Sequence, residues 1–391
     1  MSGEAFPFVL ASARDVHIAQ GLRRVVPATR LADVPERVGY LLRHLRPADH
    51  APAVVVGALP FRRDRRPRLY QPERWTRRLP SSRPGYGVWP TRSVDRLPTR
   101  WAAEPVPSSQ DYQRAVARAL ALLRAPGATL KKVVLARTLV LHANAPIDAR
   151  SIFTRLAADP AVTTYSVPLA PSPTGDRRVL IGATPEMLVA REGRHVSSRP
   201  LAGSALRRSD GAGDRQAAEQ LARSDKDLRE HAVVVEWIAD RLAPFCRDLR
   251  VPRSPSLVST ASMWHLGSTI EGVLRDDDTT ALDLALAVHP TPALCGAPAD
   301  QAFDAIGTLE PFERDFYGGA VGWVDARGDG EWHVAIRCAE ISGTTARLFA
   351  GAGIVDGSDP AAEALETSGK FSALLNALGV DEHGQPLEDA S

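Results

Sequence analysis

The sequence contains little of what marks secreted, membrane-spanning or polyanion-binding proteins. Its 391 residues include three cysteines, Cys246, Cys295 and Cys338, whose wide spacing excludes a disulfide framework and fits a reducing compartment such as the cytoplasm. No apolar run approaches the roughly 18 residues of a membrane-spanning helix, and the first residues lack the pattern of a signal peptide. The 48 basic side chains nearly balance the 46 acidic ones, so charge gives no support to a nucleic-acid-binding protein.

Lysine is scarce as well. It occurs at positions 131, 132, 226 and 370, and arginine supplies the other 44 of the 48 basic side chains. Lysine can lose its proton and act as a base, whereas arginine stays charged. Each of the four lysines is therefore a candidate functional group, although chance retention explains any single one equally well.

The pattern of apolar residues favours an α+β fold, because adjacent strands are mixed with long helices and no regular βαβ alternation is present. A length of 391 residues and 44% hydrophobic content allow two or three domains or one large one. The basic stretch 62–78 is interpreted as a solvated loop, because prolines interrupt it. The expected helices are 108–123, 148–158, 214–242, 281–287 and a last one from about 360 to 378, and the expected strands are 132–141, 162–169, 178–183, 187–191, 318–325, 331–339 and 347–350.

Four carboxylates extend the apolar faces of two predicted helices. Asp227 and Glu230 continue a face that contains Val233, Val234, Trp237, Ile238 and Leu242, and Glu363 and Glu366 continue one that contains Phe371, Leu374, Leu375 and Leu378. Buried carboxylates are costly unless they are paired or bound to a metal. Two acid pairs that converge would offer only oxygen ligands, which favours Mg²⁺ over zinc. Two unrelated surface faces would give the same spacing.

Single polar residues in apolar surroundings are weaker signals. Arg337 lies within an apolar strand candidate, where it either points to solvent or binds a carboxylate. His265 follows a tryptophan and Glu186 follows a proline at a strand end, and each has an ordinary structural explanation. The backbone of 351–353 (Gly-Ala-Gly) could approach an anion closely, but a simple turn would use glycine too.

Taken together, the motifs are specific to a family. KVVLAR, IGATPEML, RPLAGSALRR, SDKDLREH, MWHLGSTIEG, HPTPALCGAP, EPFERDFYGGAVGW, IRCAEI, LFAGAGIV and EALETSGK occur in this order. The chain thereby resembles the chorismate-utilising enzymes, and most closely the siderophore-pathway isochorismate synthases. The resemblance implies a single catalytic domain over 1–391, built from two mostly antiparallel sheets flanked by helices with the site between them. Residues 1–105 would be its divergent N-terminal part, 106–379 its motif-rich core and 380–391 a tail.

The resemblance also implies roles for individual residues. Lys132 would be the general base and Glu186 the general acid. Glu230 and Glu366 would bind Mg²⁺ directly, with Asp227 and Glu363 acting through water. The positions that match substrate-binding residues are Ala202, Gly203, Ser204, His265, Thr291, Ala293, Leu294, Tyr317, Arg337, Ala352, Gly353 and Lys370.

The activity that follows from the resemblance is the isomerisation of chorismate to isochorismate, by attack of water at C2 and loss of the C4 hydroxyl. Ala202 stands where aminodeoxychorismate synthases of one type carry a lysine, and Ser204 stands where amine-adding enzymes and salicylate synthases usually have threonine. A salicylate synthase and a non-catalytic chorismate-binding protein remain the alternatives. The expected enzyme is cytoplasmic and monomeric, feeds siderophore synthesis, and needs no amidotransferase subunit, nucleic acid or membrane.

Overall fold

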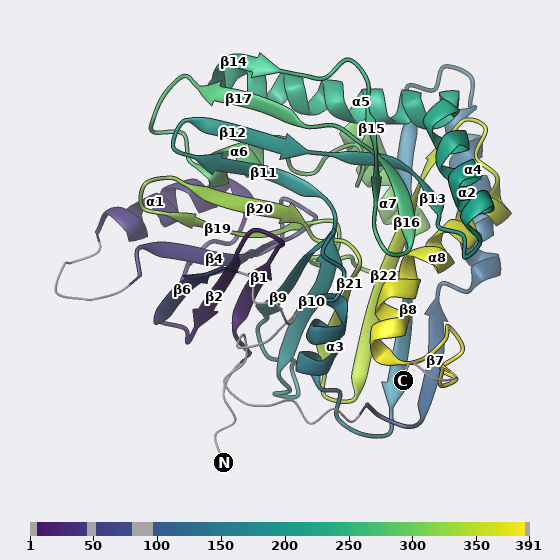
Figure 1. Cartoon of the computed structure of the whole chain (residues 1–391), viewed down its shortest axis with the longest axis horizontal. Helices are drawn as coiled ribbons and strands as arrows, with labels where there is room; N and C mark the ends of the chain where they lie inside the picture. Colours follow the sequence, from purple (N-terminus) through teal and green to yellow (C-terminus); the bar gives the residue numbers. More distant parts are fainter. Residues whose placement is uncertain (1–5, 45–51, 80–96, 388–391) are drawn as a thin grey trace.

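The computed structural model describes residues 6–44, 52–79 and 97–387. Two large sheets and one small sheet lie at the centre of this part of the chain, with helices around them (Figure 1). Every strand pairing in these residues is antiparallel. The predicted α+β domain is confirmed, and the small third sheet is an addition that the sequence did not predict.

The first large sheet has ten strands in the described part of the chain. Its long central strands are mostly buried, as expected for strands covered on both faces; β8 is rich in Val and Leu, and β22 is rich in Ala and Gly. In spatial order the strands are β18 (Gly296–Ala297), β8 (Lys132–Ala143), β22 (Thr345–Val355), β21 (Cys338–Ser342), β10 (Arg178–Thr184), β9 (Thr163–Pro168), β1 (Phe8–Ala11), β2 (Val16–Gln20) and β6 (Arg74–Arg78), with β7 (Trp101–Val106) paired to the far half of β8.

The second large sheet has nine strands and the small sheet has three, counted over the described residues. The order in the second sheet is β14 (Cys246–Arg250), β17 (Ile270–Leu274), β12 (His195–Arg199), β11 (Met187–Glu192), β20 (Gly330–Val334), β19 (Ala320–Asp325), β4 (Val54–Leu59), β5 (Arg68–Gln71) and β3 (Arg24–Val25). The small sheet consists of β13 (Leu201–Leu206), β16 (Met263–Gly267) and β15 (Ser256–Ser259).

The helices begin at side chains that accept hydrogen bonds from free backbone N–H groups. Ser108, Ser224 and Asp359 cap α2, α5 and α8 in this way, and α8 ends at Gly379 in the left-handed conformation. No helix within 6–44, 52–79 or 97–387 combines the length and apolar character needed to cross a bilayer. The helices are α1 (Val34–Arg43), α2 (Ser109–Leu123), α3 (Ala149–Leu156), α4 (Gly211–Arg223), α5 (Asp225–Leu242), α6 (Ala281–Val288), α7 (Ala299–Leu309) and α8 (Pro360–Leu378), with short 3-10 turns η1 (Leu31–Asp33) and η3 (Ala243–Phe245).

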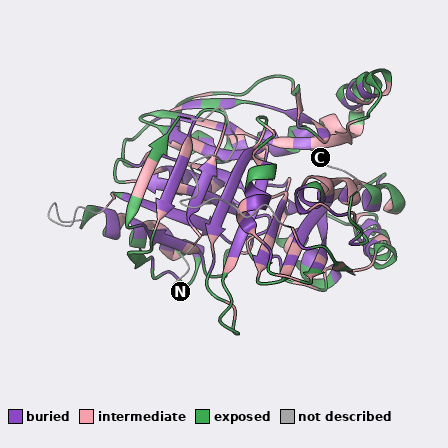
Figure 2. Ribbon diagram, turned by 60° about the horizontal axis from the view of Figure 1, so that its bottom comes forward, coloured by how far each residue is buried: buried purple, intermediate pink, exposed green. Residues whose placement is uncertain are grey.

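The core has one layer between the two large sheets and others beneath the helices. Val56 and Val321 of the second sheet belong to the same buried cluster as Leu10 and Phe349 of the first. Helices α3 and α8 cover the first sheet with side chains such as Phe371. Figure 2 shows the middle strands of the sheets as buried, with the exposed residues in the loops and on the outer helix faces. Burial of this apolar surface is the main force that joins the sheets.

Three predicted elements differ from the observed ones. The single helix expected over 214–242 is divided at Ser224, which ends α4 and caps α5. The strand expected over 331–339 is interrupted, because Arg337 adopts a left-handed backbone with a φ of 50°. The basic stretch 62–78 is not a loop throughout: it forms β5 and β6, and Leu69 is fully buried.

The face of α5 also differs from the prediction. Val233 is 42% exposed, and His231 takes its place on the buried face together with Val234 and Ile238. The predicted face of α8 is confirmed, since Phe371, Leu374, Leu375 and Leu378 are all buried.

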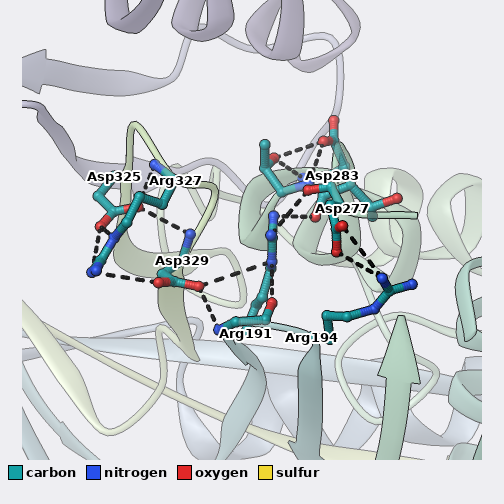
Figure 3. Close-up of polar contacts among 10 residues, drawn as sticks. Arg191, Arg194, Asp277, Asp283, Asp325, Arg327 and Asp329 are labelled. Atoms are coloured by element: carbon teal, nitrogen blue, oxygen red, sulfur yellow. Dashed lines mark hydrogen bonds and ion pairs between the residues drawn. The ribbon is translucent and has the colours of Figure 1, made fainter. Parts of the chain in front are cut away.

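A network of arginines and aspartates joins the loops at one edge of the second sheet (Figure 3). The buried Arg191 donates to the carbonyl oxygens of Gly193, Thr279 and Asp277 at 2.6–3.0 Å and lies 3.9 Å from a carboxylate oxygen of Asp329. Arg194 pairs with Asp277 nearby. The network fixes the loop that precedes α6, and its role is structural.

Candidate active site

A cavity, called the central cavity below, opens where β8 and β22 meet α5, α8 and the small sheet. Figure 1 shows these elements side by side. Segments from distant parts of the sequence line it, and most carry polar side chains. The lining residues are Val134, Pro185, Glu186, Leu201, Ala202, Gly203, Ser204, Lys226, Asp227, Glu230, His265, Ala293, Leu294, Arg314, Tyr317, Gly318, Ile336, Arg337, Phe349, Ala350, Gly351, Gly353, Glu366 and Lys370.

Glu186 is a buried carboxyl group at the wall of the central cavity. It follows β10, where Thr184 accepts a hydrogen bond from its backbone N–H at 3.2 Å. The side chain is 3% exposed, and burial raises its pKa to about 8, against the opposing effects of a backbone hydrogen bond from Leu201 and of the cations Lys132, Arg337 and Lys370. At neutral pH Glu186 therefore holds a proton that it can donate, which suits a general acid.

Lys132 approaches the central cavity through Glu230. The lysine opens β8 and is 3% exposed, and its Nζ donates to Oε1 of Glu230 on α5 at 2.8 Å. Gly353 on the neighbouring strand leaves room for this contact, because a Cβ there would lie 2.8 Å from Glu230 Oε1 and 3.0 Å from Lys132 Cε.

Lys370 and Glu366 form a second ion pair in the same cavity. Lys370 Nζ lies 2.6 Å from Glu366 Oε1 and donates to the carbonyl oxygen of Gly351 at 2.8 Å. The Ser204 hydroxyl donates to Glu366 Oε1 at 3.1 Å. Burial alone would raise the pKa of Glu366, but Lys370 and Ser204 outweigh it and leave the pKa lowered. Glu366 is therefore an anionic oxygen ligand at neutral pH.

Arg337 and His265 supply hydrogen-bonding groups that the protein leaves largely free. Within the described residues the Arg337 guanidinium donates one hydrogen bond, to the weak acceptor Met263 Sδ at 3.0 Å. Burial lowers the pKa of Arg337 to about 10, so the group remains a cation. His265 Nε2 is buried and lacks a partner in the described part of the chain. Burial, followed by the charges of Arg337 and Lys370, keeps the pKa of His265 well below its usual value, so its ring is neutral.

Tyr317 forms the floor of the central cavity with Phe349. The two rings stack with centroids 5.2 Å apart and planes 9° from parallel. A Cβ at position 351 would lie 2.8 Å from the Tyr317 hydroxyl, so Gly351 is required for this close packing. A flat apolar floor below a ring of charged groups fits a planar carboxylated ring as ligand.

The four predicted acids of α5 and α8 lie in two places: three line the central cavity and one lies behind it. Asp227, Glu230 and Glu366 all line the central cavity, whereas Glu363 is 3% exposed and pairs with Lys226 at 3.2 Å. Burial raises the pKa of Asp227, and the charges of Glu230 and Glu366 raise it further. Burial and then Glu366 raise the pKa of Glu363. Mutually repelling carboxylates that share one cavity fit the oxygen-only ligand set of a hard divalent cation.

Four of the predicted site residues do not line the central cavity. Lys132 contacts it through Glu230, and Glu363 lies behind Lys226. Thr291 is fully buried and its hydroxyl has no partner among the described residues. Ala352 is 1% exposed between the two lining glycines. The structure brings the other predicted residues together around the cavity.

The lining also includes residues to which the sequence analysis gave no role in the site. Lys226 is one of the four lysines, so its scarcity was an available signal. Arg314 lies in the EPFERDF motif, but neither residue type nor spacing shows that its guanidinium faces the cavity. Phe349 lies in a strand predicted from its apolar neighbours, and nothing in that pattern indicates which face of the strand meets a ligand.

Comparisons with known proteins are consistent over most of the chain. Residues 91–379 match the family model described as chorismate binding enzyme. The chain is 42% identical to the isochorismate synthase DhbC of Bacillus subtilis over 96% of this chain and 94% of that protein, and 35% identical to the vibriobactin-specific isochorismate synthase of Vibrio cholerae over 96% and 92%. The solved structure of DhbC from Bacillus anthracis matches with a TM-score of 0.88 and 39% identity over 96% of both chains.

Proposed function

The chain belongs to the chorismate-binding enzyme family, and we propose from this premise that it is an isochorismate synthase, an isomerase that converts chorismate to isochorismate. The observation that carries the proposal is the pair of proton-transfer groups at one cavity. Glu186 is buried with a pKa of about 8, and Lys132 reaches the same cavity through Glu230. Glu186 can give a proton near neutral pH, and the Lys132 amine is the group assigned to take one.

The reaction needs one proton removed and one supplied. Lys132 removes a proton from water as the oxygen attacks C2 of chorismate, the double bonds shift around the ring, and the C4–O bond breaks as Glu186 protonates the departing hydroxyl. One water enters and one leaves, so the reaction is a net isomerisation. Each proton transfer contributes roughly 10²–10⁴-fold to the rate.

The cationic groups of the cavity hold the substrate. Among the described side chains, the Arg337 guanidinium donates a hydrogen bond only to Met263. Its other N–H groups would bind a carboxylate of chorismate with two hydrogen bonds. Lys370 and the backbone near Gly351 border the same region. His265 is neutral with an unpartnered nitrogen, so it can hydrogen bond to substrate without adding charge. The stacked rings of Tyr317 and Phe349 support the apolar face of the ring.

Mg²⁺ is the cofactor that the acids fit. Glu230 and Glu366 would hold it, with Asp227 and Glu363 acting through water. The ion would supply a positive charge that neutralises the ring carboxylate of chorismate. Its binding to Glu230 and Glu366 competes with Lys132 and Lys370, because each lysine contacts one of these carboxylates.

The enzyme is proposed to work as a monomer in the cytoplasm and to release isochorismate for siderophore synthesis, without an amidotransferase subunit. The likeness to the vibriobactin-specific relative supports the pathway. The cysteines Cys246, Cys295 and Cys338 are free and buried, which suits a reducing compartment. Adjacent genes for an isochorismatase and a dehydrogenase would be the matching genomic observation.

The test is product analysis with purified protein. Chorismate and Mg²⁺ are incubated with the native chain and the products are separated by liquid chromatography. We expect isochorismate, and Lys132→Ala and Glu186→Gln should each lower kcat by at least about 100-fold while chorismate still binds. Lys131→Ala is the matched control, because Lys131 is the exposed neighbour of Lys132 and should leave kcat unchanged. Salicylate as the main product, or near-native turnover of either variant, would contradict the assignment.

A further inference from the structure

A second group of metal-binding side chains lies between the two large sheets, outside the central cavity. Asp15 and His17 lie at the start of β2 in the first sheet, and Glu331 and His333 lie on β20 in the second. One ligand atom each from Asp15, His17 and Glu331 lies within 4.8 Å of the other two. His333 Nε2 contacts Glu331 Oε1 and so holds this carboxylate in position. None of the four residues lines the central cavity.

The two histidines are buried with unsatisfied ring nitrogens. His17 is 2% exposed and His333 is 4% exposed, and Nδ1 of each has no hydrogen-bond partner in the described residues. Buried polar atoms without partners are rare in folded proteins because they lose their hydrogen bonds to water. The other ring nitrogen, Nε2, faces a carboxylate in each case: it lies 3.3 Å from Asp15 Oδ2 in His17 and contacts Glu331 Oε1 in His333.

The charges of the group suit a divalent ion. Two carboxylates would compensate the charge of a divalent ion, and a mixed set of nitrogen and oxygen ligands suits Zn²⁺ better than Mg²⁺. In the present arrangement Arg77 compensates Asp15, with Nη2 at 2.7 Å and Nε at 2.9 Å from its carboxylate. The Arg77 side chain is 65% exposed, so it can turn into solvent and open an entry path on the Asp15 side.

Aromatic rings hold the position of His17. The His17 ring lies 5.2 Å from the ring of Trp75 on β6 and 4.9 Å from that of Trp323 on β19. Trp75 belongs to the first sheet and Trp323 to the second, so the histidine is held between the sheets. Such packing excludes water and limits ring motion, which favours a preformed ligand position.

We propose that Asp15, His17 and Glu331 form, with His333 orienting Glu331, a second metal site, which takes a divalent transition cation such as Zn²⁺ and cross-links the two large sheets. The ligands come from two sheets that are otherwise joined here by apolar packing. A bound ion would stabilise the folded state by mass action without entering the reaction. This site is independent of the proposed activity.

The test uses the full-length protein after metal removal with a chelator. The protein is dialysed against Zn²⁺ in the presence of excess Mg²⁺, which occupies the proposed site at Glu230 and Glu366, and bound zinc is measured by mass spectrometry. We expect one zinc per chain and a higher Tm with zinc than without it. His17→Gln and Glu331→Gln should weaken zinc binding at least about tenfold, while kcat with Mg²⁺ stays native.

His195→Gln is the matched control. His195 lies 3.9 Å from Glu271, and both side chains are about half exposed. The variant therefore removes a histidine that lies beside a glutamate at the surface, outside the proposed metal site. Its zinc content should equal that of the native chain.

Three outcomes would overturn the proposal. One is a native chain that retains no zinc in excess Mg²⁺. Another is a folded His17→Gln variant that retains as much zinc as the native chain. If both core variants fail to fold, two other measurements replace them: the zinc content of Asp15→Asn, which lies on the entry side, and the X-ray absorption spectrum of the zinc-loaded native chain. A spectrum that shows only oxygen ligands around the zinc would contradict histidine ligation.

Discussion

At the scale of single residues, the cavity gives ordinary side chains unusual chemistry. Glu186 is a carboxyl group that burial keeps protonated near neutral pH, and Arg337 is a cation with free donors. These properties come from the surroundings and not from the residue types. Two predictions follow at this scale, one for the proton of Glu186 and one for a methyl group added at Gly353.

The pH dependence of the rate should report the ionisation of Glu186. A general acid works only while it carries its proton, and the pKa of Glu186 is about 8. We therefore expect kcat/KM to fall as the pH rises above about 8, approaching a tenfold loss per pH unit. The measurement is the rate of isochorismate formation across the alkaline range. A rate that rises through pH 8 and stays high would assign the acid role to another group.

A methyl group at position 353 should disturb the catalytic pair. In Gly353→Ala the new Cβ would lie 2.8 Å from Glu230 Oε1 and 3.0 Å from Lys132 Cε, so one of them must move. A shift of this size is expected to lower kcat by about 10- to 100-fold, with Tm nearly unchanged. Gly307→Ala on α7 is the control, because its Cβ meets nothing within 4 Å. Equal kcat values for both variants would show that the contact tolerates displacement.

At the scale of elements, side chains help to hold β8, the strand that begins with the proposed base Lys132. One edge pairs with β22 along nearly its whole length, while the other pairs with β18 at the start and with β7 in the far half. In the gap between them Arg314 donates to the carbonyl oxygen of Val134 at 2.7 Å, and Glu310 accepts from the N–H of Ala136 at 2.7 Å. This buried ion pair satisfies backbone groups that a further strand would otherwise pair.

Breaking this ion pair should cost much more than breaking one at the surface. Glu310→Gln leaves Arg314 buried without its counter-charge, since both side chains are 3% exposed, and should lower the free energy of unfolding by about 3–5 kcal/mol. Glu313→Gln is the control: Glu313 pairs with Arg65 at 2.9 Å with both side chains more than half exposed, so its loss should cost at most about 1 kcal/mol. Urea unfolding measures both. Similar costs for the two variants would contradict the bridging role of Glu310.

At the scale of the whole molecule, the N-terminal third is part of both large sheets. β1 pairs with β9 in the first sheet and β4 pairs with β19 in the second, so strands from the divergent part lie against strands of the motif-rich core. All six residues of β4 are buried. The central cavity therefore depends on a core to which residues without any recognised motif contribute.

Removal of the N-terminal strands should abolish folding rather than release a smaller enzyme. A chain that lacks residues 1–79 would expose the partners of β1 and β4 and lose much of the layer between the sheets. We expect no cooperative urea transition and no turnover, in contrast to the intact chain. A truncated protein with a sharp transition and measurable kcat would show that 80–391 folds independently.

Much of the fold could be predicted from the sequence because it depends on local periodicity. The apolar face of α8, the helix predicted over 108–123 and the long strand that begins at Lys132 follow from the spacing of residues close together in the chain. The order of the motifs also sufficed to identify the family. Local patterns could not predict the break at Arg337, because a left-handed arginine is held in place by surrounding structure rather than by its own preference.

What the sequence by itself determined is the family and several of the main elements, such as α2, α8 and β8, since these reside in short stretches of chain. Only the tertiary structure decided which side chains meet. Lys132 and Glu230 are 98 positions apart and touch because β8 and α5 pack at one cavity. Asp15 and Glu331 are brought together by two facing sheets, and the sequence spacing of these residues does not indicate that they are close. Contacts of this kind, and the shifted pKa of Glu186, arise from burial and packing, which exist only after the chain has folded.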